Sequence, residues 1–267
     1  LLNKNTSNQH NSNLLAMGAI YGDSLPTGSP LNRSPELSKL RSKLPPLDAI
    51  RAELDALKPM MEGNYYYGKT ANEKTFKEEA SKYAILHLAM HGVLNEKHPI
   101  LSSLAFTENG DPEEDNFLQA FEISQMKLNA ELVVLSACET GYGKFQQGEG
   151  VMSLARSFMY AGVPSMVVSM WQVNDASTAL IMSAFYNNLA QGMDKAKALQ
   201  QAKLFYINHA QGITAHPAFW AAFIQLGDAS PIQFKAPIST WFWMLGIAGI
   251  ALIFALFWRL KKRKELA

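Results

Sequence analysis

Short apolar segments alternate with longer stretches of helical character in this chain of 267 residues. The apolar segments cover residues 83–90, 130–137 and 163–171, and a loop of small residues follows each of them. Stretches of helical character cover residues 150–162 and 175–190. Strands that alternate with helices are typical of a mainly parallel sheet with helices on both faces, so we expect an α/β fold.

Further elements are expected on both sides of this central region. Apolar residues at positions 47, 50, 54 and 57 have helical spacing between two proline-containing ends, which predicts a helix there. A second helix is expected over about 71–81 and a third over 194–210. A last short apolar run, at 219–227, follows the third helix.

The first 44 residues have a different composition. The chain begins without methionine on a polar, asparagine-rich stretch, and residues 22–46 are rich in Pro, Gly and Ser. We therefore expect residues 1–44 to be disordered or to form an incomplete N-terminal part of the domain, in a fragment of a longer protein. The domain itself is expected over 45–228.

A membrane anchor is expected near the C-terminus. Residues 238–258 contain no charged side chain and have tryptophans near both ends; about 20 such residues cross a bilayer as a helix, the alternative being a buried core helix. Residues 229–237 form the linker before this helix, and the tail 259–267 is basic. Positive charge marks the cytoplasmic side, so we expect a cytoplasmic tail and a domain on the far side of the membrane. The alternative is that the chain inserts tail-first and leaves the domain in the cytoplasm.

Composition excludes several classes of site. The formal net charge of +1 gives no reason to expect nucleic acid as a partner. A single cysteine excludes an internal disulfide framework and any metal site built from several cysteines. The histidines are not spaced as a pair of helical ligands, so we expect no metal. The glycines after residue 140 lack the spacing of a phosphate-binding loop.

The single cysteine, Cys138, lies where the apolar run 130–137 ends. His91 lies at the end of the preceding apolar run. Ligands bind beyond the carboxyl ends of strands in open α/β sheets, and adjacent parallel strands would bring these two side chains together. A thiol beside an imidazole can perform nucleophilic catalysis. The alternative is a buried cysteine and a structural histidine; for His87, inside the strand, we expect a buried hydrogen-bonded side chain.

The two segments that contain these residues resemble motifs of a known family. "LHLAMHG" is similar to the histidine motif and "LSACETGYG" to the cysteine motif of the CHAT domain, a caspase-like peptidase domain related to separase that often follows tetratricopeptide repeats. The resemblance continues through "LARSFMYAGVPSMVVSMWQVND" and "HPAFWAAFIQLGD" and covers about residues 45–228. His91 precedes Cys138 by roughly 50 residues, as in caspases. The resemblance implies a caspase-like, mainly parallel sheet between helices.

It also implies roles for individual residues. Cys138 would be the nucleophile and His91 the catalytic histidine, with no cofactor. The backbone N–H groups of Gly92 and Cys138 would stabilise the oxyanion. Asp175 resembles the acidic residue that receives a basic P1 side chain in separase-type relatives, or it caps the helix that follows. Glu139 either lines the site or faces solvent.

The resulting expectation is a membrane-anchored cysteine endopeptidase that cleaves a protein partner and is regulated by an upstream tetratricopeptide-repeat region. One alternative is a catalytically silent CHAT domain that serves as an interaction or scaffold module. A more remote alternative is a thiol-dependent acyltransferase that uses the same residues.

Overall fold

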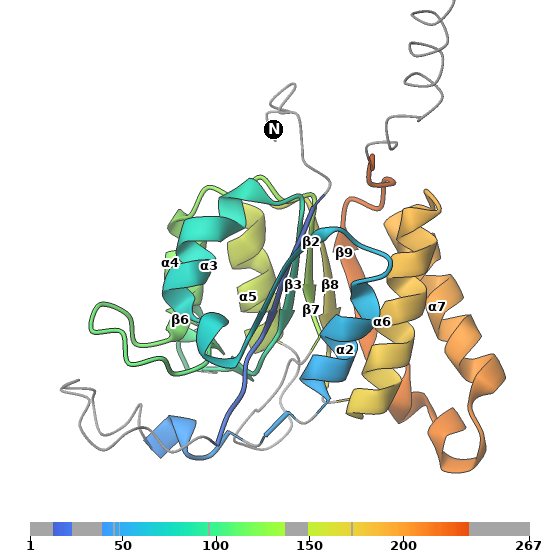
Figure 1. Ribbon diagram of the computed structural model, residues 1–267, viewed down its shortest axis with the longest axis horizontal. Helices are drawn as coiled ribbons and strands as arrows, with labels where there is room; N and C mark the ends of the chain where they lie inside the picture. Colours follow the sequence, from blue (N-terminus) through green and yellow to red (C-terminus); the bar gives the residue numbers. More distant parts are fainter. Residues whose placement is uncertain are drawn as a thin grey trace, which may run out of the picture. The chain divides into compact units, whose positions relative to one another are not determined.

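A six-stranded sheet in the order β2-β1-β3-β7-β8-β9 forms the centre of the computed structural model (Figure 1). The structure describes residues 13–22, 39–44, 46–47, 49–95, 97–136, 149–171 and 173–234. The strands are β1 (Leu14–Gly18), β2 (Gly63–Tyr67), β3 (Ile85–Ala89), β7 (Leu132–Leu135), β8 (Ser165–Ser169) and β9 (Phe223–Gly227). The pairs from β2 through β8 are parallel, and only β9 runs antiparallel to its neighbour. The expectation of a mainly parallel sheet is confirmed.

Helices cover both faces of this sheet. Figure 1 shows α3 (Glu73–Glu79), α4 (Ala120–Gln125) and α5 (Glu149–Tyr160) on one face, and α2 (Ile50–Leu57), α6 (Asp175–Ala190) and α7 (Lys195–His209) on the other. Short 3-10 helices lie in the connections: η1 (Gly68–Thr70), η2 (Ala80–Lys82), η3 (Pro99–Leu101), η4 (Gly212–Ala215) and η5 (Pro217–Phe219). This is the α/β sandwich of sheet and helices that the sequence predicts.

The two faces of β3 show how the sequence pattern places the core. All five residues of the strand are buried. Leu86 and Leu88 belong to the apolar cluster that also contains Phe76 of α3 and Phe158 of α5. His87 faces the opposite side, where it contacts α2 and α6. A strand buried on both faces reads as a continuous apolar run, and this explains why residues 83–90 showed no alternation of polar and apolar residues.

Close packing of α2 on β1 depends on a glycine. A Cβ atom at Gly18 would lie 2.2 Å from Cγ2 of Ile50 and 3.2 Å from Cδ2 of Leu54. Both side chains are buried, Leu54 completely. The helix can therefore approach the end of β1 this closely only because residue 18 has no side chain.

A second, smaller sheet follows β3 directly. It is antiparallel, with the order β4-β5-β6, and comprises β4 (Gly92–Val93), β5 (Ser103–Ala105) and β6 (Phe117–Gln119). The η3 helix lies in the connection between β4 and β5. Because β4 begins one residue after His91, this sheet fixes the direction in which the chain leaves the end of β3.

The predicted helices and strands are present within a few residues of their expected bounds, but α4, the three strands of the small sheet and two strands of the six-stranded sheet, β1 and β2, were not predicted. β1 lies in the interior of the sheet, between β2 and β3, and all five of its residues are buried. It comes from the first 44 residues, so ordered structure of the domain begins before the expected boundary at residue 45. β2 forms the edge of the sheet and is partly exposed.

The chain divides into two units, Leu1–Gln233 and Phe234–Ala267. Residues 235–267 lie outside the described part, and with them the expected span 238–258 and the basic tail 259–267. Across the described ranges, which end at residue 234, no helix combines the length and apolar character needed to cross a membrane.

Candidate active site

The carboxyl ends of β3 and β7 meet at one edge of the sheet. The two strands are parallel neighbours, with Leu88 in register with Leu135. Ser136 continues β7 and donates its N–H to the carbonyl oxygen of Leu88 at 3.3 Å. His91 lies three residues after Leu88 and is only 2 % exposed. The predicted neighbourhood of the two strand ends is therefore confirmed.

Cys138 lies two residues beyond Ser136, in the segment 137–148 that is outside the described residues. Glu139 and the glycines of the same loop fall in that segment as well. The pairing of His91 with Cys138, and the placing of Glu139 beside them, therefore stay predictions.

Tyr21 holds the backbone around His91. The N–H of His91 donates to the Tyr21 hydroxyl oxygen at 2.9 Å, and this hydroxyl donates to the carbonyl oxygen of Ala105 at 2.5 Å. The N–H of Ala105 in turn donates to the carbonyl oxygen of His91 at 2.9 Å. The rings of Tyr21 and His91 also contact one another, with centroids 4.8 Å apart and a tilt of 35°. Tyr21 thus joins the end of β1 to the start of the small sheet.

Sequence reasoning missed Tyr21. It lies three residues after β1, as His91 lies two residues after β3. The rule that functional side chains follow the carboxyl ends of parallel strands would have pointed to it. The rule could not be applied to Tyr21, because residues 14–18 were not predicted to form a strand of the sheet.

Gly92, to which the resemblance assigns an oxyanion-binding N–H group, follows His91 directly in the chain. It begins β4, is buried, and pairs with Leu104 of β5. Ordered pairing of this kind holds the backbone in one direction, which is a condition for an oxyanion-binding N–H group. Its contribution to an oxyanion hole stays a prediction.

Ser136 adds an unexpected polar atom at this edge. Ser136 is 3 % exposed, and among the described residues its hydroxyl oxygen has no hydrogen-bond partner. Buried polar atoms without partners are rare in folded proteins and often occur at functional sites. Ser136 therefore marks the end of β7 as a place where the fold retains an unsatisfied group.

The structure corrects one of the two interpretations of Asp175. The residue that caps α6 is Asn174, whose side-chain oxygen accepts from the N–H groups of Ala176 and Ser177 at 3.1 and 3.3 Å. Asp175 is the first residue within the helix. The N-cap interpretation of Asp175 is therefore wrong by one position, while its role toward a substrate stays a prediction.

His87 is a structural residue, as expected. Its side chain is fully buried, with Nε2 3.1 Å from Oε1 of Glu53 and Nδ1 3.0 Å from the hydroxyl of Tyr186. Burial, followed by the charge of Glu53, raises the pKa of Tyr186 well above its ordinary value, so the phenol stays neutral. The three side chains connect β3 to α2 and α6.

The architecture defines a class, an α/β domain with a mainly parallel sheet between two layers of helices. The crystal structure of the Arg-specific cysteine proteinase gingipain R has a similar fold, with a TM-score of 0.51 and 10% sequence identity. The alignment covers 83% of this chain and 47% of that one. At this identity the likeness concerns the fold.

The chain belongs to the CHAT domain family, which it matches over residues 3–228. Tetratricopeptide repeat protein 28 is similar over 128 residues, with 30% identity for the human protein and 28% for the mouse protein. The aligned part is 48% of this chain but only 5% of each relative. The family match begins before β1, in agreement with the interior position of that strand. The resemblance to the CHAT domain in the sequence is confirmed.

Proposed function

We propose that the domain is a cysteine endopeptidase that cleaves a protein partner, with Cys138 as nucleophile and His91 as its base and acid. The observation that carries the proposal is the position of His91, at the end of β3 beside the parallel strand β7 that leads to Cys138. Membership of the CHAT family and the fold shared with a cysteine proteinase support the same assignment.

The expected reaction has two stages. The thiolate of Cys138 attacks the carbonyl carbon of the substrate, and the N–H groups of Gly92 and Cys138 stabilise the oxyanion that forms. His91 then protonates the departing amine, which leaves an acyl-enzyme. Water, deprotonated by His91, hydrolyses this thioester and restores the thiol.

Labelling with a thiol-reactive peptidyl probe tests the proposal most directly. The wild-type chain should be labelled once, Cys138→Ala should not be labelled, and His91→Ala should be labelled far more slowly because its thiol is no longer activated. His209→Ala is the matched control, since His209 is an exposed histidine at the end of α7. Labelling of His91→Ala at the wild-type rate would overturn the dyad and favour the interaction module.

Membrane attachment is a second part of the proposal. Residues 238–258 would cross the membrane once, with the basic residues that follow on the cytoplasmic side and the domain on the other. Protease added to intact cells that carry the full-length protein should then digest the domain. Protection before lysis, with digestion after it, would place the domain in the cytoplasm.

The upstream region is the third part. The similar relatives are tetratricopeptide repeat proteins, and this chain spans about 5% of their length. We expect such repeats before residue 1 in the full-length protein, where they would regulate access to the site. Sequencing the complete reading frame tests this expectation, and a frame that lacks helical repeats upstream would contradict it.

A further inference from the structure

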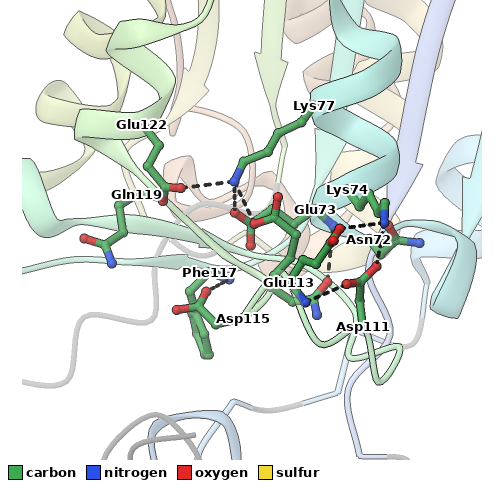
Figure 2. Close-up of polar contacts among 12 residues, drawn as sticks. Asn72, Glu73, Lys74, Lys77, Asp111, Glu113, Asp115, Phe117, Gln119 and Glu122 are labelled. Carbon is green, nitrogen blue, oxygen red and sulfur yellow. Dashed lines mark hydrogen bonds and ion pairs between the residues drawn. The ribbon is translucent and has the colours of Figure 1, made fainter. Parts of the chain in front are cut away.

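Three carboxylates from separate elements meet around Lys77 (Figure 2). Glu73 begins α3, Glu122 lies in α4, and Glu114 lies in the loop between β5 and β6. One oxygen from each lies within 4.8 Å of the others. The Lys77 Nζ is 2.7 Å from Glu73, 2.7 Å from Glu114 and 3.1 Å from Glu122. We call Glu73, Glu114 and Glu122 the carboxylate cluster.

One oxygen of the cluster is buried without a partner. The Glu73 side chain is 1 % exposed; its Oε1 contacts Lys77, while its Oε2 accepts no hydrogen bond from the part of the chain that the structure describes. A buried carboxylate oxygen without a donor is costly, so a cation that reaches it would be favoured. One ammonium group also offsets only one of the three negative charges that the ionised cluster carries. The carboxylate cluster therefore carries more negative than positive charge, and Oε2 of Glu73 could still accept a bond from a cation.

The spacing of the oxygens suits a calcium ion. Ca²⁺ binds six to eight oxygens at about 2.3–2.6 Å, so two oxygens that share it lie up to about 5 Å apart. Mg²⁺ requires about 2.0–2.1 Å and a near-ideal octahedron, which limits its ligands to about 4.2 Å apart. The oxygens of the carboxylate cluster all lie within 4.8 Å of one another, a range that Ca²⁺ accommodates in full and Mg²⁺ only in part.

Solvent can reach this position. The side chains of Glu114 and Glu122 are 21% and 27% exposed, and that of Lys77 is 29% exposed. A lysine has a long flexible chain and can move its ammonium group into water. Glu122 is already oriented for binding, because its Oε2 accepts the backbone N–H of Gln119 at 2.9 Å while its Oε1 faces the cluster.

We propose that the carboxylate cluster of Glu73, Glu114 and Glu122 binds a calcium ion in place of the Lys77 ammonium group. The ion brings two positive charges where the lysine brings one, and it gives Oε2 of Glu73 a ligand bond. Bound calcium would hold α3, α4 and the loop between β5 and β6 together. The cysteine and histidine content predicts no metal site, and this site contains neither residue type.

Calorimetric titration of the full-length chain with CaCl₂, after removal of metals with EDTA, tests the proposal. We expect one Ca²⁺ per chain, a raised Tm in CaCl₂, and much weaker binding of Mg²⁺. Glu114→Gln and Glu122→Gln should each weaken Ca²⁺ binding by about tenfold or more. Mutation of residues that only hydrogen-bond to metal ligands already causes a loss of this size. Because Glu114 lies in a partly exposed loop, its variant should fold even if a change at Glu73 does not.

Two variants separate a calcium site from a purely structural ion pair. Lys77→Met removes the competing ammonium group and should therefore bind Ca²⁺ more tightly than wild type. Glu113→Gln is the matched control, because this 72% exposed carboxylate pairs with Lys74 and is outside the cluster. The proposal is overturned if neither wild type nor Lys77→Met binds Ca²⁺, or if Glu114→Gln binds it as wild type does.

Discussion

Tyr21 connects three segments that are distant in the sequence, and its hydroxyl is the only part of the side chain that can do so by hydrogen bonding. It accepts from the N–H of His91 and donates to the carbonyl oxygen of Ala105. A phenylalanine would keep the ring contact with His91 and lose both bonds. The contribution of the two hydrogen bonds of the hydroxyl can therefore be measured separately from the contribution of ring packing at this position.

We predict that Tyr21→Phe slows labelling of Cys138 and lowers kcat by about two- to tenfold, with little change in KM. The reason is that a typical hydrogen bond contributes about 0.5–1.5 kcal/mol, here to the position of His91. The matched control is Tyr160→Phe, because Tyr160 is 79% exposed. An unchanged kcat in Tyr21→Phe, together with a lowered free energy of unfolding, would show that Tyr21 has a structural role alone.

Asp175 and Asn174 allow substrate recognition and helix capping to be tested at adjacent positions. If Asp175 receives the P1 side chain, Arg and Lys should be preferred there, and Asp175→Asn should reduce this preference. Asn174→Ala should leave specificity unchanged and lower the free energy of unfolding by about 1 kcal/mol, because it removes the cap. A peptide-library profile of the three proteins measures the effect, and an unaltered profile for Asp175→Asn would exclude it from the P1 site.

Glu73 makes stability depend on pH. Burial raises its pKa to about 7, with Lys77 opposing and Glu114 and Glu122 adding to the increase. Burial alone would lower the pKa of Lys77. Its hydrogen bonds to Glu114 and Glu73 outweigh this effect and raise the pKa above its ordinary value, so Lys77 stays charged. Since the folded chain holds the Glu73 proton more tightly than the unfolded chain, this contribution is complete below pH 4.5 and is lost as the pH rises through about 7.

In EDTA, the urea midpoint of the wild-type chain should therefore fall between pH 5 and pH 8. Glu73→Gln cannot ionise, so its midpoint should change less over the same interval. Glu113→Gln serves as the control, because an exposed carboxylate should leave the wild-type dependence in place. Parallel pH profiles for wild type and Glu73→Gln would mean that another group is responsible.

At the level of elements, the contact between α2 and β1 has no space for a side chain at Gly18. We predict that Gly18→Ala lowers the free energy of unfolding by about 1–3 kcal/mol, since its Cβ would overlap the Ile50 side chain. Ile50→Ala removes the overlapping atom. The cost of Gly18→Ala should therefore be smaller in the Ile50→Ala background, as urea unfolding of the four proteins would measure; equal costs in both backgrounds would contradict the steric cause.

The elements differ in how well the sequence announces them. β3, β7 and β8 were predictable because strands buried on both faces are continuous apolar runs. β1 is equally buried, but its five residues stand between a polar stretch and a loop, with no neighbouring pattern to identify them. β2 is an edge strand with tyrosines on a partly exposed surface, and it lacks an apolar run altogether.

The sites differ in the same way. The place of His91 at a strand end could be predicted because it follows a predicted strand, whereas its pairing with Cys138 stays a prediction. The carboxylate cluster could not be predicted, since Glu73, Glu114 and Glu122 are brought together by tertiary packing of two helices and a loop. No spacing of residues within a single helix or strand predicts that contact. Sequence reasoning was thus successful where one element carries the signal and failed where three elements share it.

At the scale of the whole molecule, the sheet of the domain is built around a strand near the N-terminus, so we expect folding of the domain to depend on these residues. β1 pairs with β2 on one side and with β3 on the other, over five residues each. It also leads to Tyr21, which holds the backbone of His91. The CHAT match from residue 3 and the place of β1 in the sheet agree that the domain includes this region.

We therefore predict that a truncated chain starting at residue 45 does not fold cooperatively, whereas a chain starting at residue 3 does. Without β1, the ladder bonds of β3 on that side are lost, β2 is separated from the sheet, and the apolar side chains that pack against Leu15 and Met17 are exposed. Urea unfolding of both chains, with the same C-terminus, measures the difference. A cooperative transition at the same midpoint for the shorter chain would show that the sheet is stable without its interior strand and that the domain begins where the sequence pattern had placed it.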